Sequence, residues 1–120
     1  MPNSTDHILQ AKHNEDFYQV IDKKLYSDWA MTVLFYAALH YIDAFLDRVG
    51  IDPGGHQERD KLVQNRKELC PIWHQYKFLK NRSINARYYC GTFTLTQLQQ
   101  CYGGDLAAIR KCLLPLTSAK

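Results

Sequence analysis

The spacing of apolar residues predicts α-helix along nearly the whole chain. Apolar positions recur at intervals of three and four residues, which is the pattern of helices that bury one face. Turn residues and polar stretches divide this pattern into segments at residues 5–23, 27–49, 56–69, 71–90 and 94–114. No internal repeat and no linker between domains is visible. The sequence therefore predicts an all-α protein with a single domain over residues 1–120 and a core from about residue 5 to residue 114.

Capping and turn residues predict where the helices begin and end. Ser, Thr and Asp side chains favour the N-cap, where they accept a hydrogen bond from a free backbone N–H. The predicted N-caps are Ser4, Thr5 or Asp6 for the first segment and Ser27 or Asp28 for the second. The predicted stops are Gly50 for the second segment, Gly91 for the fourth and Pro115 for the fifth. Gly103 and Gly104 lie inside the fifth segment, and because two glycines cost about 2 kcal/mol of helix propensity, a kink or break is expected there.

The second segment is apolar nearly all round in its first turns, which predicts a central helix. One polar stripe crosses it, formed by Tyr36, His40, Asp43 and Asp47 at steps of four, three and four residues. Polar groups on an apolar helix need partners. These side chains either form an internal network that fixes the register of the helix, or they hold His40 beside a carboxylate, ready for proton transfer.

The start of the third segment combines residues that suit phosphate binding. His56 and Arg59 share one face of the helix and directly follow a Pro-Gly-Gly loop. The free N–H groups and the dipole of a helix N-terminus favour an anion, and the two side chains add proton transfer and bidentate phosphate binding. The alternative is structural, with His56 capping the helix and Arg59 paired to a nearby carboxylate such as Asp52 or Asp60.

A second basic group lies near the end of the fourth segment, where Arg87 precedes Tyr88. Arg87 offers a contact to a phosphate. The alternative is a solvated basic face on which Arg87 pairs with Asp43 or Glu68.

The sequence predicts neither a metal site nor a cofactor. It contains no His-x-x-x-His or His-Glu-x-x-His spacing and no glycine-rich phosphate loop. Its four cysteines form no Cys-x-x-Cys pair. We therefore expect free, mostly buried thiols in a reducing compartment.

Composition and charge exclude few classes of function. The chain is 46% hydrophobic and 22% charged, with a net charge of +3, which permits nucleic acid as a partner without demanding it. The first twenty residues are polar and charged, and the longest apolar run, at residues 29–39, is too short to span a bilayer. We therefore expect no signal peptide, no membrane contact and a cytoplasmic location.

Several of these residues together resemble the HEPN domains of bacteria and archaea. The second segment contains Phe35-Tyr36-Ala37-Ala38-Leu39-His40, which is similar to the tyrosine-rich helix of that family. The similarity continues with His56-x-x-Arg59 and with a later motif formed by Tyr76, Leu79, Ser83, Ala86, Arg87 and Tyr88. The resemblance covers roughly residues 5–114.

The resemblance implies an up-and-down four-helix bundle with an additional short helix, commonly dimerised through faces of the bundle. Many members act in toxin–antitoxin, antiviral or stress systems, and the active ones are metal-independent ribonucleases. Those enzymes use an Arg and a His four to six residues apart on one helix. The present chain lacks that motif, because Arg48 and His56, like Arg66 and His74, have seven residues between them.

Three functional hypotheses follow from the residues and the resemblance. The first, favoured by the missing motif, is a non-catalytic HEPN-like module that forms a homodimer and binds RNA, a nucleotide or a cognate partner protein. The second is an atypical ribonuclease, in which His56 or His40 transfers protons while Arg59 and Arg87 hold the phosphate. The third is a purely structural interaction domain. The further ligand-binding candidates are Tyr36, Asp43 and Tyr88.

Overall fold

The computed structural model describes residues 2–118, and over this range the chain forms helices, turns and loops without a strand. The predicted all-α class is confirmed. The predicted domain also includes residues 1, 119 and 120, which lie outside the described range. The elements are α1 (Ser4–Val20), α2 (Ser27–Arg48), α3 (His56–Asn65), the 3-10 turn η1 (Cys70–Ile72), α4 (Trp73–Tyr88), α5 (Leu95–Gln100), the π-helical segment η2 (Cys101–Leu106) and α6 (Ala107–Ser118).

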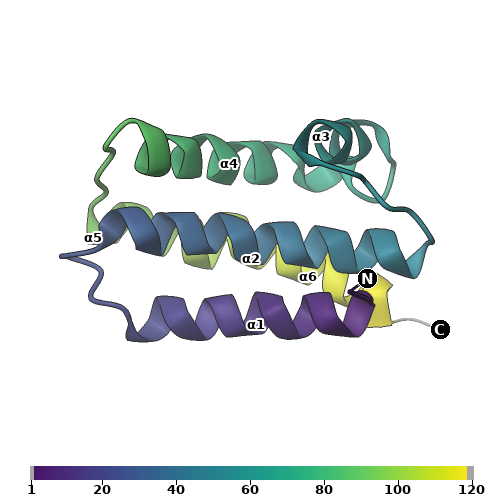
Figure 1. The fold of residues 1–120 in the computed structure, drawn as a ribbon, viewed down its shortest axis with the longest axis horizontal. Helices are drawn as coiled ribbons and strands as arrows, with labels where there is room; N and C mark the ends of the chain where they lie inside the picture. Colours follow the sequence, from purple (N-terminus) through teal and green to yellow (C-terminus); the bar gives the residue numbers. More distant parts are fainter. Residues whose placement is uncertain (1, 119–120) are drawn as a thin grey trace.

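Helix α2 is the centre of the molecule. It lies between α1 and α4 in Figure 1, with α6 behind it, and it contacts all three. Met31, Leu34, Phe35 and Ile42 are fully buried in this helix. By length and composition alone α2 could cross a membrane, but 78% of its most apolar 18-residue window is buried inside the fold. The predicted central helix is confirmed.

The other long helices run alongside α2, and α3 crosses them at one end. Figure 1 shows α1 and α4 on opposite sides of α2, while α3 lies near the C-terminal end of α2. The loop at residues 49–55 connects those two helices, and the N-terminus lies at the same end of the molecule. As a result, residues of α1, α2 and α3 can meet there.

Helix α3 is shorter than the sequence predicts. It ends at Asn65, whereas the apolar pattern continues to residue 69. Arg66 has an extended backbone (φ −77°, ψ 132°), so the chain turns away from the helix axis. Leu69 then enters the core and is fully buried. The apolar pattern extends beyond the helix because Leu69 is buried from the turn that follows α3. A longer helix would have buried it equally well, so the pattern could not distinguish the two.

The N-caps of α1 and α2 differ from those predicted. The side-chain oxygen of Asn3 accepts a hydrogen bond from the N–H of Asp6 at 2.9 Å, and the Asp6 carboxylate accepts one from the N–H of Asn3 at 3.0 Å. This reciprocal capping box starts α1 at Ser4. The N-cap of α2 is Tyr26, which makes no side-chain capping bond. Ser27 instead accepts a hydrogen bond from the N–H of Phe93 at 3.0 Å, which ties the loop before α5 to α2.

The predicted glycine stop is confirmed for α2, at Gly50. For α4 the left-handed residue is Cys90, one residue before the predicted Gly91. Gly50 follows α2 with a φ of 79°, in the left-handed region that glycine adopts easily. After α4 it is Cys90, not Gly91, that takes the left-handed conformation, with a φ of 58°. Gly91 then donates its N–H to the carbonyl of Asn85 at 3.0 Å. A Cβ on Gly91 would meet the Asn85 side chain at 2.1 Å, so close approach explains this glycine.

The expected irregularity at Gly103-Gly104 takes the form of a π-helical segment rather than a break. The residues of this region that are buried at the core are Leu98, Cys101, Leu106, Ile109 and Leu113. The step from Cys101 to Leu106 is five residues, which a normal α-helical turn cannot place on one face. The wider turns of η2 absorb the extra residue, and both glycines are exposed on it.

Pro115 lies inside α6 and does not end it, contrary to the prediction. A proline within a helix removes one backbone hydrogen bond. The helix continues for three residues beyond it, to Ser118. Within this last turn the Thr117 hydroxyl donates to the carbonyl of Leu113 at 2.8 Å.

The cysteines are all free, but they are less buried than the sequence predicts. Cys70 and Cys90 are exposed, Cys112 is half-buried and Cys101 is buried. Burial raises the pKa of the Cys101 thiol to about 11, so this group stays protonated near neutral pH. The prediction of mostly buried thiols is therefore wrong for Cys70 and Cys90, which lie in turns beside helix ends.

Candidate functional site

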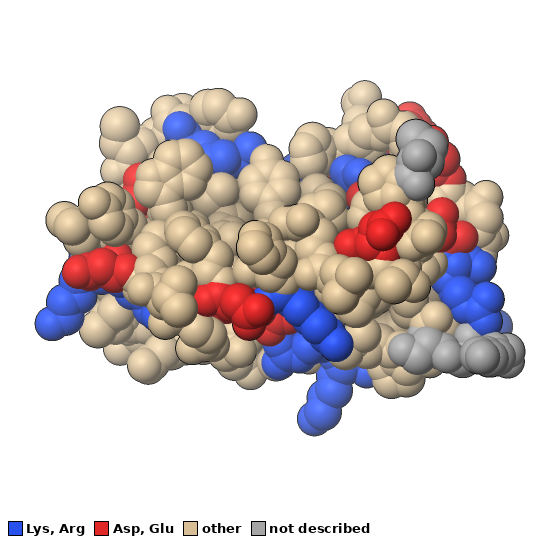
Figure 2. Space-filling view, turned by 60° about the horizontal axis from the view of Figure 1, so that its bottom comes forward, with Lys and Arg blue, Asp and Glu red and all other residues tan. Residues whose placement is uncertain are grey.

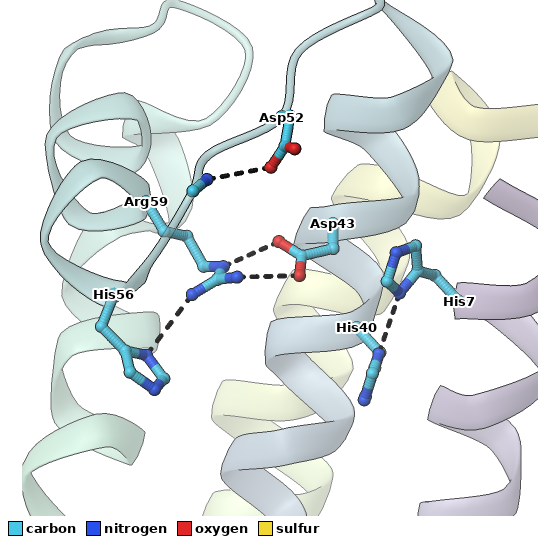
Figure 3. A network of polar contacts seen from close by, with 7 residues as sticks. His7, His40, Asp43, Asp52, His56 and Arg59 are labelled. Atoms are coloured by element: carbon cyan, nitrogen blue, oxygen red, sulfur yellow. Dashed lines mark hydrogen bonds and ion pairs between the residues drawn. The ribbon is translucent and has the colours of Figure 1, made fainter. Parts of the chain in front are cut away.

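Arg59 and Asp43 form a buried, bidentate ion pair between α3 and α2. The Nε of Arg59 donates to Oδ1 of Asp43 at 2.7 Å, and Nη2 donates to Oδ2 at 2.9 Å. The two side chains are only 10% and 11% exposed. Burial by itself would lower the pKa of Arg59, but the hydrogen bonds and the charge of Asp43 raise it. Figure 3 shows the guanidinium reaching across from α3 to the carboxylate on α2.

This pairing favours the structural interpretation of Arg59. The expected structural partners, Asp52 and Asp60, are the wrong carboxylates: Asp52 accepts a hydrogen bond from the N–H of Gly54 at 2.9 Å, and Asp60 pairs with Lys80. The structural interpretation itself is supported, with Asp43 in their place. Asp43 occupies the edge of the guanidinium formed by Nε and Nη2, and the remaining Nη1 faces His56.

His56 begins α3 and stays exposed. Its Nδ1 lies 3.4 Å from Nη1 of Arg59, and its ring lies 6.3 Å from the ring of Phe35, measured between centroids. Gly55 is the N-cap of α3 and no side chain caps it, so His56 does not act as a cap. Desolvation lowers the pKa of His56, and the positive charges of Arg59 and Lys80 lower it further. His56 is therefore neutral near pH 7 and able to accept a proton.

His40 pairs with another histidine and not with a carboxylate. Its Nδ1 lies 3.0 Å from Nδ1 of His7 on α1, as Figure 3 shows. One of the two rings donates and the other accepts, so at least one must be neutral. Desolvation and the neighbouring His7 lower the pKa of His40, while the charge of Asp43 acts in the opposite direction. The expected arrangement of His40 held by a carboxylate is wrong about the partner.

The pairing of His7 with His40 can be predicted from the register of the α1–α2 hairpin, although not from the apolar pattern alone. α1 and α2 form a helical hairpin that turns between Val20 and Ser27. His7 lies 13 residues before Val20 (20 − 7), and His40 lies 13 residues after Ser27 (40 − 27). Antiparallel helices of equal rise place such positions side by side, so a hairpin register predicts the pair.

Arg87 contacts a tyrosine of α2 and no carboxylate. Its Nη1 donates to the hydroxyl of Tyr36 at 2.8 Å, and its Nη2 donates to the hydroxyl of Ser83 at 3.2 Å. The guanidinium carbon also lies 5.4 Å from the ring centre of Tyr36 and 5.1 Å from that of Tyr88. Within residues 2–118, no ion pair includes Arg87. The expected pairing with Asp43 or Glu68 is therefore wrong, since Asp43 holds Arg59 and Glu68 holds Arg66.

The polar stripe of α2 splits between three neighbouring helices. Tyr36 turns to α4, His40 to α1 and Asp43 to α3. Each side chain thus has a partner, which supports the interpretation of the stripe as an internal network. Asp47 extends it, because its carboxylate accepts hydrogen bonds from the N–H and the hydroxyl of Ser4 at 2.8 and 3.0 Å.

Three hollows border these side chains. One, of about 630 Å³ at the end of α4, is lined by Arg87 and Tyr88 together with Lys24 and Asp28. The other two differ in charge. The end cleft, of about 620 Å³, lies where α1, α2 and the 49–55 loop meet. Its lining includes the carboxylates of Asp43, Asp47 and Asp52 beside Arg59 and His7. Figure 2 shows acidic side chains gathered at this right-hand end of the molecule.

The side groove, of about 340 Å³, runs between α1 and α2. It is lined by Gln10, Asn14, Phe17, Trp29, Thr32, Val33, Tyr36 and His40. None of these described lining residues is acidic. The two hollows therefore suit different ligands, although His40 of the side groove and His7 of the end cleft touch one another.

A second buried network lies outside the residues that sequence reasoning selected. The Tyr41 hydroxyl donates to Glu15, and Arg110 pairs with the same carboxylate. These residues connect α1, α2 and α6. Their spacing within each helix carries no local motif, so only the packing of the helices brings them together.

The structure brings His56, Arg59 and Asp43 into one cluster and places Arg87, Tyr36 and Tyr88 in another. Among the residues that the structure describes, no group of three or more His, Cys, Asp or Glu side chains could hold a metal ion. Comparison of the chain with protein-family models, with curated proteins and with solved structures gives no significant match. Its own side chains and their contacts are therefore the basis for a function.

Proposed function

We propose that the chain is a non-catalytic helical module that binds a phosphate-bearing ligand, RNA or a nucleotide, through Arg87. The observation that carries this proposal is the environment of Arg87. It is a partly exposed cation with no carboxylate partner among the described residues, and its guanidinium carbon lies 5.4 Å from the ring centre of Tyr36 and 5.1 Å from that of Tyr88. An arginine beside aromatic rings can contact a phosphate while a base stacks nearby.

The end cleft is the weaker candidate for an anion. Arg59 is the arginine in its lining, and Asp43 already neutralises it. Asp47 and Asp52 add two further carboxylates to the same lining. A phosphate entering this cleft would meet like charge, which costs free energy at short range.

The resemblance to HEPN domains supports the same proposal. On that basis we infer a HEPN-like, up-and-down four-helix bundle made by α1, α2, α4 and the α5–η2–α6 unit, with α3 as the additional short helix. We also infer a cytoplasmic homodimer that acts with a cognate partner in a toxin–antitoxin, defence or stress system. Sedimentation velocity of the purified chain tests the dimer, since a monomer at all concentrations would contradict it.

Binding to labelled RNA tests the role of Arg87. We expect the wild type to bind RNA with an affinity that falls steeply between about 50 and about 200 mM salt. Arg87→Gln should weaken binding and reduce the salt slope by about 1, as expected for one lost phosphate contact. Lys111→Gln is the matched control, because Lys111 is an exposed cation on α6 away from the site. Equal effects of the two substitutions, or no RNA binding by the wild type, would refute the proposal; the latter result favours a purely structural interaction domain.

An atypical metal-independent ribonuclease is the second candidate, favoured by the state of His56. Desolvation and nearby cations lower the pKa of this exposed imidazole, so it can accept a proton from a ribose 2′-hydroxyl near neutral pH. Incubation of RNA with the protein in EDTA tests this activity. Cleavage by the wild type that His56→Ala abolishes would establish the ribonuclease and overturn the non-catalytic proposal. His13→Ala is the control, because His13 is exposed on α1.

A further inference from the structure

The side groove between α1 and α2 has the chemistry of a nucleobase site. Trp29 is 56% exposed and Phe17 is 44% exposed, although both are large apolar side chains. They face the groove from opposite helices, and Tyr36 lies in the same lining. Exposed aromatic rings that line one hollow offer stacking surfaces, and stacking on aromatic rings is how proteins hold unpaired bases.

Polar groups of the groove add hydrogen-bonding partners for base edges. Gln10 donates from Nε2 to Oδ1 of Asn14 at 2.9 Å, which leaves the remaining amide atoms of both residues available. His40 lies in the same lining, and the lowered pKa of this group leaves it neutral near pH 7. Amide and neutral imidazole groups can both donate and accept, as the edges of unpaired bases require.

The described lining of the groove carries no Lys, Arg, Asp or Glu, and the cation Arg87 adjoins it. Arg87 adjoins it through the hydrogen bond to the hydroxyl of Tyr36, 2.8 Å away. A strand with its bases in the groove could therefore place a phosphate on Arg87, which lines the neighbouring hollow with Lys24, Tyr88 and one carboxylate, Asp28.

The length of the groove fits a short run of bases. Trp29 and Tyr36 lie seven residues apart on α2, which at 1.5 Å per residue is about 10 Å. Successive stacked bases are about 3.4 Å apart, so the rings span about three of them. Base pairs of a duplex present their edges and not their faces, so a duplex could not use these rings.

We propose that the side groove binds unpaired bases of single-stranded RNA, with Trp29 and Phe17 as stacking surfaces and Arg87 as the phosphate contact. This inference rests on the proposed function and narrows its ligand to single strands. It also makes Trp29 the residue that distinguishes a single strand from a duplex.

Fluorescence anisotropy with labelled RNA tests the groove. Wild type, Trp29→Ala, Arg87→Gln and Phe78→Ala are each titrated into a single-stranded oligonucleotide and into a duplex of the same length. Phe78 is the matched control, because it is a 43% exposed aromatic residue on α4 that does not line the groove. Circular dichroism shows that each variant keeps its helices.

We expect Trp29→Ala to weaken binding of the single strand at least about five-fold, the lower end of the loss of one stacked base. Binding of the duplex should not change, and Phe78→Ala should bind both ligands like the wild type. Arg87→Gln should weaken binding of both ligands, because phosphates are present in each.

Three results would overturn the inference. If Trp29→Ala binds the single strand as the wild type does while Arg87→Gln is impaired, the groove proposal fails and the proposed function stands. If Trp29→Ala instead loses self-association in sedimentation with RNA binding unchanged, the groove is an interface between copies. If the wild type binds neither RNA at low salt, both proposals fail.

Discussion

At the scale of single residues, the buried pair of Asp43 and Arg59 is the most constrained feature of the candidate site. Both charged groups of the pair are largely removed from water, and each satisfies the other through two hydrogen bonds. The attraction between two buried charges mainly offsets the cost of removing them from water, so the pair stabilises the fold little more than apolar side chains would. Removing one partner, however, leaves an unpaired charge buried, which is strongly destabilising. This asymmetry makes the pair a structural clamp between α2 and α3.

Asp43→Asn should therefore destabilise the protein by about 3 kcal/mol, because the charge of Arg59 stays buried without its counterion. Urea denaturation of wild type and variant measures the change. Replacing the pair together, as Asp43→Leu with Arg59→Met, should cost clearly less than Asp43→Asn alone. Glu58→Gln is the control, since Glu58 pairs with Lys61 on the surface with both side chains more than 60% exposed and should change stability by less than about 0.5 kcal/mol. Equal costs for Asp43→Asn and Glu58→Gln would show that the pair is not buried as described.

His40 makes stability depend on pH in a predictable direction. Its pKa is lowered in the folded state by desolvation and by His7, with Arg59 acting in the same direction and Asp43 against it. The unfolded chain then binds more protons than the folded one below the ordinary histidine pKa of about 6.5. The stabilisation by neutral His40 is thus fully present above about pH 6.5 and is lost as the pH falls below it.

The free energy of unfolding of the wild type should therefore fall more steeply than that of His40→Gln between about pH 7.5 and about pH 5.5. Glutamine keeps a hydrogen-bonding group beside His7 but cannot titrate. Denaturation at several pH values measures the difference between the two proteins. His13→Gln, at an exposed position of α1, should follow the wild type; a parallel curve for His40→Gln would contradict the prediction.

At the scale of elements, the π-helical segment η2 keeps two helices in phase. The buried residues before it end with Cys101, and those after it begin with Leu106. A continuous α-helix would rotate α6 relative to α5 by the angle of one residue, about 100°. The extra residue in η2 removes this rotation. The two exposed glycines lower the helix propensity of the segment, which makes the irregular turns cheaper there than elsewhere.

Deleting Gly103 should convert η2 into ordinary α-helix and leave the fold intact. The buried step from Cys101 then becomes four residues, which a regular helix accepts, and one glycine is lost from the helix at a gain of up to about 1 kcal/mol. Deleting Lys111 is the control, because the step between Ile109 and Leu113 changes from four residues to three and the last turn of α6 rotates. Thermal unfolding should show little change for the Gly103 deletion and clear destabilisation for the Lys111 deletion. The reverse order would show that η2 does not correct the register.

At the scale of the whole molecule, polar networks join α2 to every long helix around it. Glu15, Tyr41 and Arg110 connect α1, α2 and α6, while Arg87 and Tyr36 connect α4 to α2. Three carboxylates line the end cleft, whereas the described residues that line the side groove include none. The net charge of +3 contains no information on where the charges lie. Composition alone therefore could not show that the two hollows differ in charge.

Tyr41→Phe should destabilise the protein by about 1 to about 3 kcal/mol, because an oxygen of the buried Glu15 carboxylate loses its donor. Burial and the adjacent Glu15 raise the pKa of Tyr41 well above its usual range, so its hydroxyl remains protonated and donating. Chemical denaturation compares this variant with Tyr26→Phe, whose tyrosine is 46% exposed and should change stability by less than about 0.5 kcal/mol. If both variants cost equally little, solvent must reach Glu15.

The sequence by itself determined what depends on neighbours along the chain. The three- and four-residue spacing of apolar positions predicted the helical class and the central place of α2. The conformational freedom of glycine predicted the stop at Gly50. The same spacing placed His56 and Arg59 on one helix face and identified the polar stripe of α2. These features follow from the geometry of one or two helical turns, which is the same in every helix.

Only the tertiary structure decided which partner each polar side chain meets. Asp43 and Arg59 are 16 residues apart, His7 and His40 are 33 apart, and Tyr36 and Arg87 are 51 apart. The π-helical correction at η2 likewise depends on packing, because it brings the buried residues on both sides of the segment to the core. The physical reason is that a side chain selects its partner by the angle and register at which whole helices pack, and burial of the apolar faces sets those quantities before any polar pair forms.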